Sequence, residues 1–319
     1  MAKWKVLIND GMHSTGIGML KDAGFEVDTI NIPNEDLPTR LEGYDVICVR
    51  SATKVRKELI DQTPSLKMIV RGGVGLDNID VDYARSKGIT VANTPGASSR
   101  SVAELVMGHI LALARSLHLS NREMPVKGNT EFKALKKKYS RGLELQGKKL
   151  GIVGCGRIGK ALASLAIGMG MEVIPVDIYE TLELDVYIAG RMIPLDIPVV
   201  SLEEMLKKAD FISVHVPALG KPLIDASAFE LMKTDVILVN AARGGVVDEE
   251  ALLQALDSGK LYGAALDVFL NEPHPKQALL EHPRISVTPH TGASTLEAQE
   301  KIGIEAAEQI IAAYEKSIT

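Results

Sequence analysis

The sequence has little cysteine, no long apolar run and no excess of basic residues. Only two cysteines occur in 319 residues, so neither a disulfide framework nor a cysteine-bound metal is expected, and Cys48 lies in an apolar run typical of a buried strand. No stretch reaches the roughly 18 apolar residues of a membrane-spanning helix. The formal net charge of -5 gives no general attraction to nucleic acid or to an anionic membrane.

The amino-terminal sequence MAKWKVLIND enters a strand-like pattern directly, without the apolar segment of a signal peptide. Together with the low cysteine content, this favours a reducing, cytoplasmic location. Because the chain as a whole is acidic, an anionic ligand has to be bound by a local cluster of arginine, lysine or backbone N–H groups.

The length and the composition, 46% hydrophobic and 24% charged, favour two domains with cores of their own. Short apolar runs alternate with helix-period segments from KVLIND to GITVANTP and again from KKLGIVG to RISVTPH, which is typical of parallel α/β sheets. A long apolar-periodic stretch at 99–121 separates the two series, and 294–316 should form a last helix. We predict two doubly wound α/β domains, of the Rossmann or flavodoxin type, with the active site in the cleft between them. Residues 99–287 form one domain, and residues 1–98 plus 288–319, where the last helix packs back, form the other.

The best-defined motif runs from residue 150 to Asp177: a strand, the turn GCGRIG, a helix-period run and a second strand. Gly154 permits the tight turn, Gly156 lets the backbone approach a pyrophosphate at the helix N-terminus, and Gly159 lets the helix lie close to the strand. The Asp177 carboxylate would accept hydrogen bonds from ribose hydroxyls and repel a 2'-phosphate, which favours NAD over NADP. A glycine-rich turn that only packs tightly is the ordinary alternative. The predicted NAD-binding residues are Gly154, Gly156, Arg157, Ile158, Gly159 and Asp177.

Three ionisable residues follow later strands of the second series, where ligands bind in an open α/β sheet. Arg243 follows DVILVNAA, Glu272 follows LDVFLN, and His290 follows SVTP. Position alone leaves ordinary alternatives open. Arg243 could be a surface ion-pair partner, Glu272 a surface carboxylate, and His290 a loop histidine with no catalytic role.

Motifs along nearly the whole chain resemble those of the D-isomer-specific 2-hydroxyacid dehydrogenases. They include RGGVGLDNID at 71–80, GIVGCGRIG at 151–159, NAARGGVVDE at 240–249, GAALDVFLNEP at 263–273 and TPHTGAST at 288–295. The resemblance implies an NAD-dependent oxidoreductase that acts at the 2-position of a small 2-hydroxy or 2-keto acid. It is strongest to the members that oxidise D-3-phosphoglycerate to 3-phosphohydroxypyruvate, the first step of serine biosynthesis.

The resemblance implies that His290 is the acid/base, Glu272 its partner and Arg243 the clamp on the substrate carboxylate and carbonyl oxygen. In oxidation, a neutral imidazole takes the hydroxyl proton as hydride leaves for the nicotinamide; in reduction, the imidazolium returns it. A carboxylate bonded to the other ring nitrogen would fix the tautomer. A guanidinium offers two parallel bonds to a carboxylate, which a lysine does not.

The same resemblance assigns further cofactor contacts. Asp267 should meet the nicotinamide carboxamide, and His215 should line the cofactor cleft. Each has an ordinary alternative, a loop cap for Asp267 and strand-end packing for His215. Ala241 and Gly292 are also expected to contact the cofactor.

Positive charge is expected around the substrate. Arg50, Lys54 and Arg71 would supply more charge than one carboxylate needs, which points to a second anionic group such as a phosphate. In the resembling phosphoglycerate enzymes, the arginines that match Arg50 and Arg71 contact the substrate. Backbone N–H groups around Val74 and Gly75 should bind the substrate carboxylate, unless this glycine-rich turn only reverses the chain.

Some features depart from the pattern or carry no assignment. Ser98 and Val74 differ from the residues of some phosphoglycerate enzymes, and residues 178–200 are longer than usual, without a functional account. The basic cluster Lys136–Lys138 fits a solvated loop as well as it fits substrate approach. The chain stops soon after its last predicted helix, so a carboxy-terminal regulatory domain with feedback inhibition by serine is not expected.

Two other functions compete with the phosphoglycerate assignment. One is another member of the family, such as a glyoxylate or hydroxypyruvate reductase or a D-lactate dehydrogenase, which would have little use for both Arg50 and Arg71. The other is an NAD-sensing binding protein. The family usually dimerises through its NAD domain, so a homodimer is expected; the helix at 99–121 is a candidate contact, although a core helix is the more ordinary interpretation. No metal, nucleic acid or membrane partner is expected.

Overall fold

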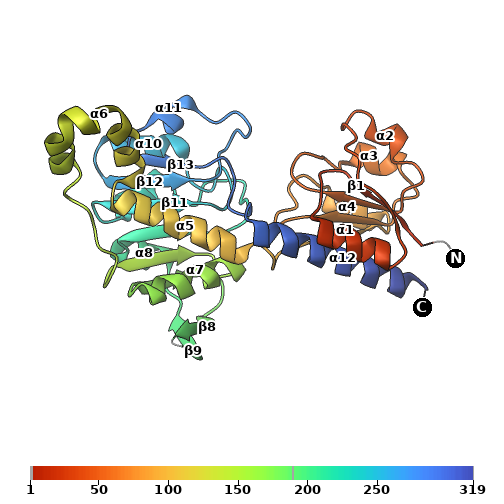
Figure 1. Cartoon of the computed structure of the whole chain (residues 1–319). Coiled ribbons are helices and arrows are strands. Elements are labelled where there is room, and N and C mark those ends of the chain that lie inside the picture. Colours follow the sequence, from red (N-terminus) through yellow and green to blue (C-terminus); the bar gives the residue numbers. More distant parts are fainter. Residues whose placement is uncertain (1–2, 189, 319) are drawn as a thin grey trace. The chain divides into compact units, whose positions relative to one another are not determined.

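The chain forms two compact α/β units, each built around a parallel sheet (Figure 1). The computed structural model describes residues 3–188 and 190–318. Unit 1 comprises Met1–Ser99 and Ala293–Thr319, and unit 2 comprises Arg100–Gly292. Residues 1–2, 189 and 319 fall within the predicted domains but lie outside the described residues.

Unit 1 has the strand order β2-β1-β3-β4-β5, with all strands parallel. Successive side chains of a strand enter different cores, because they point to opposite faces of the sheet. Leu7 of β1 packs with α2, α3 and α4, whereas Val6 and Ile8 pack with α1 and α12. Cys48 is buried in β3, as its apolar run predicts. The elements are β1 (Lys5–Ile8), α1 (Ser14–Asp22), β2 (Glu26–Asp28), α2 (Leu37–Arg40), β3 (Val46–Val49), α3 (Lys57–Gln62), β4 (Met68–Arg71), α4 (Val81–Ser86), β5 (Thr90–Asn93) and α12 (Leu296–Ile318).

The last helix, α12, completes unit 1 and lies beside α1 (Figure 1). A Cβ atom at Gly16 would lie 2.3 Å from the carbonyl oxygen of Gly303, so the two backbones touch where these glycines meet. Near the other end of the helix, Tyr314 packs edge-on against Trp4, with ring centroids 5.5 Å apart. The predicted last helix is therefore present, and it packs on the first series of strands.

Unit 2 has the strand order β13-β12-β11-β10-β6-β7, also all parallel. The chain runs outward from β6 to β7 on one side and from β10 to β13 on the other, so the strand order reverses between β6 and β10. Ligands of open α/β sheets bind at the carboxyl ends of the strands at such a switch point. The elements are α5 (Ser99–Ala114), α6 (Leu117–Lys138), β6 (Lys149–Val153), α7 (Arg157–Gly168), β7 (Glu172–Val176), α8 (Leu202–Lys208), β10 (Phe211–Val214), α9 (Ala226–Leu231), β11 (Val236–Asn240), α10 (Glu249–Asp257), β12 (Leu261–Leu266), α11 (Gln277–Glu281) and β13 (Ile285–Val287).

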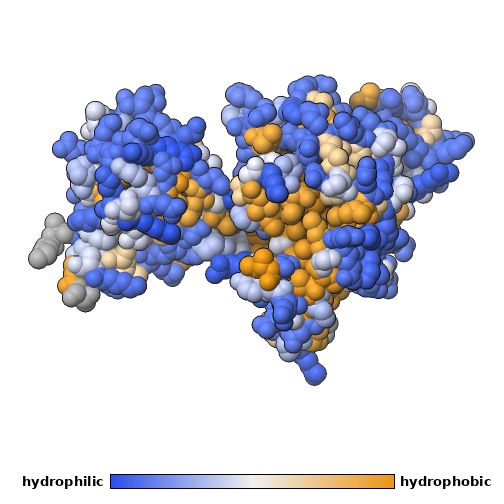
Figure 2. Space-filling view, turned by 180° about the vertical axis from the view of Figure 1, so that it is seen from behind, coloured by the Kyte–Doolittle hydropathy of each residue, from blue (hydrophilic) through white to orange (hydrophobic). Residues whose placement is uncertain are grey.

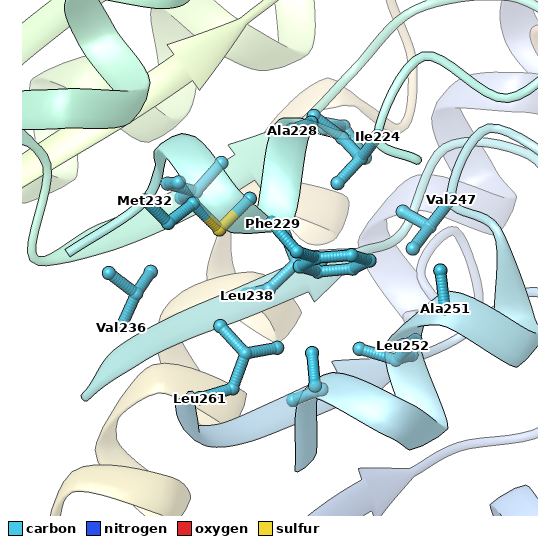
Figure 3. Close-up of a cluster of buried hydrophobic side chains, with 14 of the residues drawn as sticks. Ile224, Ala228, Phe229, Met232, Val236, Leu238, Val247, Ala251, Leu252 and Leu261 are labelled. Carbon is cyan, nitrogen blue, oxygen red and sulfur yellow. The ribbon is translucent and has the colours of Figure 1, made fainter. Parts of the chain in front are cut away.

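The sheet of unit 2 separates two hydrophobic cores. Phe229 of α9 lies in the first core, against Leu238 of β11 and Leu252 of α10 (Figure 3). The neighbouring strand residue Ile237 points the other way, into the core formed with α5 and α7. The surface of unit 2 also carries apolar side chains, which gather in one area of the face seen in Figure 2.

The predicted helix at 99–121 is two helices. Ser116 has a left-handed backbone (φ 50°), which ends α5 at Ala114 and starts α6 at Leu117. Val106 and Ile110 of α5 are buried in the core of unit 2, as the core-helix interpretation requires. Among the described residues no single helix is long and apolar enough to cross a membrane, although α5 and α6 together meet the criteria of length and composition as a pair bent by 58°.

The basic cluster Lys136–Lys138 is the last turn of α6, not a loop. Lysines in this position compensate the negative end of the helix dipole. Lys138 also forms a 2.8 Å ion pair with Glu123 of the same helix. The cluster is thus part of a helix on the surface of unit 2, and Lys138 is already paired there.

Residues 181–198, within the unusually long segment, form an antiparallel pair of strands, β8 (Thr181–Ile188) and β9 (Arg191–Pro198). Leu182, Leu184 and Val186 are buried in the core that contains α7, whereas Glu183 and Asp185 between them are exposed. The extra residues thus add a two-stranded sheet that packs on the α7 side of unit 2.

Candidate active site

In the glycine-rich turn after β6, two of the three glycines are closely packed and the third, Gly156, faces open space. A Cβ atom at Gly154 (φ 91°) would be 2.6 Å from the His215 carbonyl oxygen, and one at Gly159 would be 2.2 Å from the Gly154 carbonyl oxygen. A Cβ atom at Gly156 would meet nothing within 4 Å. The helix that follows begins at Arg157, and no side chain caps its first turn. The N–H groups of Arg157 and Ile158 therefore open the helix at a place suited to a pyrophosphate.

Asp177 directly follows β7 and faces the same turn. One carboxylate oxygen accepts a hydrogen bond from the N–H of Cys155, and the other accepts one of 2.7 Å from the N–H of Ile178. A carboxylate has about four acceptor positions, so positions remain for two ribose hydroxyls. Burial raises the pKa of the Cys155 thiol to about 12, so this cysteine stays a protonated packing residue.

His215 directly follows β10, across the switch point from the glycine-rich turn. Its Nε2 lies 2.9 Å from the hydroxyl of Ser213. Its Nδ1 is buried and has no partner among the described residues, and burial lowers the pKa of the ring to about 4. A neutral imidazole with an unused polar atom beside an open glycine turn fits a crevice that takes a polar ligand. Ala241, the remaining predicted contact near these strands, directly follows β11 and is buried.

The loop that carries Arg243 is shaped by Asn240, the buried last residue of β11. The Asn240 side chain donates to the Arg243 carbonyl oxygen (3.0 Å) and accepts from the N–H of Ala242 (3.1 Å). A Cβ atom at Gly244 would lie only 2.0 Å from the Phe269 carbonyl oxygen. Glycine therefore lets this loop touch the loop after β12, which carries Glu272. The half-buried Arg243 donates from Nη1 to the Ala242 carbonyl oxygen at 2.6 Å.

Glu272 and His290 are in contact. The Nδ1 atom of His290 lies 2.8 Å from Glu272 Oε2, and the exposed fractions of the two side chains are 47% and 36%. The second carboxylate oxygen of Glu272 accepts from the N–H of Phe269 at 2.9 Å, which fixes the carboxylate on its own loop. A carboxylate at Nδ1 favours the tautomer with the proton on that nitrogen, so Nε2 is the ring atom available for proton transfer.

The backbone around His290 is held by one buried carboxylate. Asp267, 1% exposed, accepts hydrogen bonds from the hydroxyl of Thr288 (2.6 Å) and from the N–H groups of Thr291 (2.8 Å) and Gly292 (2.9 Å). His290 itself has a left-handed backbone, with φ 54°. These bonds match the loop-cap interpretation of Asp267, and its contact with nicotinamide stays a prediction, as does that of Gly292.

Residues 288–292, assigned by the sequence to the first domain, lie in unit 2. The sequence pattern placed the boundary where the apolar run RISV ends. The chain instead leaves unit 2 after Gly292, because the hydrogen bonds to Asp267 hold the segment on β12. His290, Glu272 and Arg243 therefore belong to one unit.

The predicted substrate residues lie in unit 1, at the carboxyl ends of neighbouring strands. Arg71 ends β4 opposite Val49 of β3, and Arg50 is the next residue after Val49. Arg50 donates to the side-chain oxygen of Gln299, a neutral partner. Val74 and Gly75 lie in the loop after β4, where the Asn93 side chain donates to the Val74 carbonyl oxygen at 2.5 Å.

Sequence reasoning missed several residues that shape the site. Asn240 and Thr288 lie in the motifs NAARGGVVDE and TPHTGAST. Their closeness in sequence to Arg243 and His290 could have identified them. Glu249 accepts a 2.7 Å hydrogen bond from the N–H of Leu270 and so helps to hold the loop of Glu272; it too lies in a quoted motif. His109, bonded to Thr288 at 3.1 Å, carries no signal in the sequence.

Comparison with known proteins defines the class. The family description "D-isomer specific 2-hydroxyacid dehydrogenase, NAD binding domain" matches residues 107–292. A hydroxypyruvate reductase from Thermotoga maritima is 43% identical over 317 residues, which cover 97% of this chain and 98% of that protein. A D-3-phosphoglycerate dehydrogenase from Methanocaldococcus jannaschii is 41% identical over 308 residues, which cover 96% of this chain and 56% of that protein.

A solved structure agrees over the full length. The crystal structure of the TT0316 protein from Thermus thermophilus is 33% identical and has a TM-score of 0.82, with coverage of 98% of this chain and 97% of that one. The fold and the glycine-rich turn are those of an NAD-dependent oxidoreductase. The chain belongs to the D-isomer-specific 2-hydroxyacid dehydrogenase family. It spans nearly all of the hydroxypyruvate reductase, but only about half the length of the phosphoglycerate dehydrogenase.

Proposed function

We propose that this protein oxidises D-3-phosphoglycerate to 3-phosphohydroxypyruvate with NAD⁺, the first step of serine biosynthesis. The observation that carries the proposal is the pair Arg50 and Arg71 at the carboxyl ends of β3 and β4. Among the described residues, no carboxylate pairs with the Arg50 guanidinium, whose partner is the Gln299 amide, although the backbone N–H of Arg50 donates to Asp10 at 2.6 Å. In an acidic chain, two guanidinium groups at one sheet edge fit a substrate with a phosphate in addition to its carboxylate.

The chemistry rests on the side chains of unit 2. NAD⁺, when bound, supplies the hydride acceptor. His290 Nε2 takes the proton of the 2-hydroxyl group as the hydrogen on C2 leaves with its electron pair, and Glu272 at 2.8 Å stabilises the imidazolium that forms. Arg243 holds the substrate carboxylate with two parallel bonds, which orients C2 for transfer.

A second candidate is the reduction of hydroxypyruvate. It is favoured by the 43% identity to the Thermotoga maritima hydroxypyruvate reductase, which this chain matches end to end. The same histidine would then give its proton to the keto oxygen, and the substrate would carry no phosphate. The two candidates share every step of the chemistry and differ in what Arg50 and Arg71 bind.

Steady-state rates separate the candidates. The absorbance at 340 nm is followed with NADH and 3-phosphohydroxypyruvate, hydroxypyruvate, glyoxylate or pyruvate, and the series is repeated with NADPH. The proposal expects the highest kcat/KM with the phosphorylated acid and NADH. A higher value for hydroxypyruvate assigns the second candidate, and binding of NADH without turnover of any acid would indicate an NAD-sensing protein.

The variant Arg71→Ala tests the phosphate site. We expect KM for 3-phosphohydroxypyruvate to rise about 10- to 100-fold with little change in kcat, because one charge-assisted bond is lost from substrate binding. The control is Arg56→Ala in the same unit, since Arg56 is already paired with Asp80 at 2.9 Å. An equal loss on hydroxypyruvate would count against a phosphate contact.

We also propose that two copies of the chain associate through α6. Of its 22 residues only Leu135 is buried, whereas Leu117 and Met124, which are seven residues apart and so lie on one side of the helix, are exposed. A helix with so little packing is only marginally stable by itself, and burial of this apolar side against a second copy would stabilise it. Sedimentation equilibrium should give a dimer that Met124→Asp converts to a monomer, and a monomeric parent protein would disprove the proposal.

A further inference from the structure

His109 is a buried histidine far in the sequence from every predicted site residue. It lies on α5, is 5% exposed, and points to the end of β13. Its Nδ1 atom is 2.9 Å from the Ser286 hydroxyl, and its Nε2 atom is 3.1 Å from the Thr288 hydroxyl. Both partners lie within four residues of His290, so the imidazole adjoins the segment that carries the acid/base.

The direction of each hydrogen bond around His109 follows from the donors and acceptors present. The ionised carboxylate of Asp267 only accepts, so the Thr288 hydroxyl gives its single proton to Asp267 Oδ1 at 2.6 Å. The Thr288 oxygen can then only accept from His109, so Nε2 carries the proton. In the neutral ring Nδ1 is the acceptor, and Ser286 donates to it.

This order of protons connects His109 with the backbone around His290. Asp267 holds that backbone by the N–H groups of Thr291 and Gly292, at 2.8 and 2.9 Å. The N–H of His290 donates to the Thr288 carbonyl oxygen at 3.1 Å. A Thr288 hydroxyl turned away from Asp267 would leave a buried carboxylate with one fewer donor, which weakens the hold on the loop.

We propose that His109 is a positioning residue that acts through Thr288 and Asp267 to hold His290 in place for proton transfer. The proposal rests on the acid/base role of His290. Burial lowers the pKa of His109 despite the nearby Asp267 charge, so the ring stays neutral at neutral pH and keeps one donor and one acceptor. The half-buried His118, also near this ring, lowers the same pKa further.

The variant His109→Leu removes the donor and keeps an apolar side chain in the core. We expect kcat to fall about 10- to 100-fold, because a small displacement of the acid/base is costly, while the Kd for NADH changes less than twofold. Thr288→Val removes the hydroxyl at the other end of the bond and should give a similar loss. The double variant should be no slower than the slower single variant, since both act on one bond.

Two control variants separate positioning from loss of packing. Val106→Ala, on the same helix and in the same core, removes packing but no hydrogen bond and should leave kcat within twofold. His109→Gln keeps an N–H donor near the Nε2 position and should recover most of kcat. Equal losses of kcat in all four single variants would overturn the proposal. Additive losses in the double variant of His109 and Thr288 would also overturn it.

Long-range ¹H–¹⁵N spectra test the tautomer without any assay. The His109 signals, assigned by their absence in His109→Leu, should show a protonated Nε2 and an unprotonated Nδ1; the reverse would also overturn the proposal. His290→Gln, measured alongside, distinguishes a failure of the proposed function from a failure of the positioning role. If His290→Gln is fully active, the proposed function fails. If it is inactive while His109→Leu has normal activity, only the positioning role of His109 fails.

Discussion

His290→Gln is expected to lower kcat by about 10²- to 10⁴-fold, the usual contribution of a positioned general acid or base. Glutamine keeps a polar group beside Glu272 but cannot take up or release a proton in the working pH range. The substitution removes no group near the glycine-rich turn, so NADH should bind with a Kd within twofold of the parent value. The measurements are the rate at 340 nm and the quenching of NADH fluorescence.

The matched control for this variant is His274→Gln. His274 is exposed and lies two residues after Glu272 in the loop that follows β12. The control should retain full activity, because His274 lies outside the contact between His290 and Glu272. Unchanged turnover of His290→Gln would remove this histidine from the mechanism, and a large rise in the Kd for NADH would assign it a binding role instead.

Much of the fold can be predicted from the sequence because local pattern and tertiary burial agree. The central strands of both sheets are short apolar runs, and their alternate residues enter two cores, as Ile237 and Leu238 do. The glycine-rich turn is equally direct. Gly154 and Gly159 have no room for a side chain, so their identity reports the close packing of β6, α7 and His215.

The sequence is less informative where a single backbone angle determines where one helix ends and the next begins. The apolar period of 99–121 continues through Ser116, but its left-handed conformation divides the segment into α5 and α6. The strands β8 and β9 have an alternating pattern in LELDVYI, yet from the sequence residues 178–200 were identified only as a segment longer than usual. Local propensity alone does not reveal how these segments pack.

Contacts between distant residues also escape a sequence pattern. The motifs around Glu272 and His290 indicate two candidate groups, and the structure adds that Nδ1 faces the carboxylate at 2.8 Å. The support behind them, from His109 through Thr288 to Asp267, joins residues separated by up to 179 positions. Only the parallel arrangement of β12 and β13 beneath α5 brings these residues together.

Arg243→Lys is expected to lower kcat/KM by about 10²- to 10³-fold, although the positive charge is retained. A lysine ammonium is a point charge and cannot form the two parallel bonds that a guanidinium makes with a carboxylate. The loss of one such bond accounts for about 1.5–3 kcal/mol, and poorer alignment of C2 adds to it. Both KM for the keto acid and kcat should therefore change, while the Kd for NADH should not.

The control for Arg243→Lys is Arg191→Lys, an exposed residue at the start of β9 in the same unit. It should leave KM and kcat unchanged. This result would separate the loss of the two parallel guanidinium bonds at residue 243 from a general effect of replacing arginine by lysine. The loop itself should survive the substitution at 243, because Asn240 and Gly244 hold it through backbone atoms. A variant with a normal KM and a low kcat would mean that Arg243 acts on the developing charge of the carbonyl oxygen more than on the carboxylate, and full activity would remove it from the site.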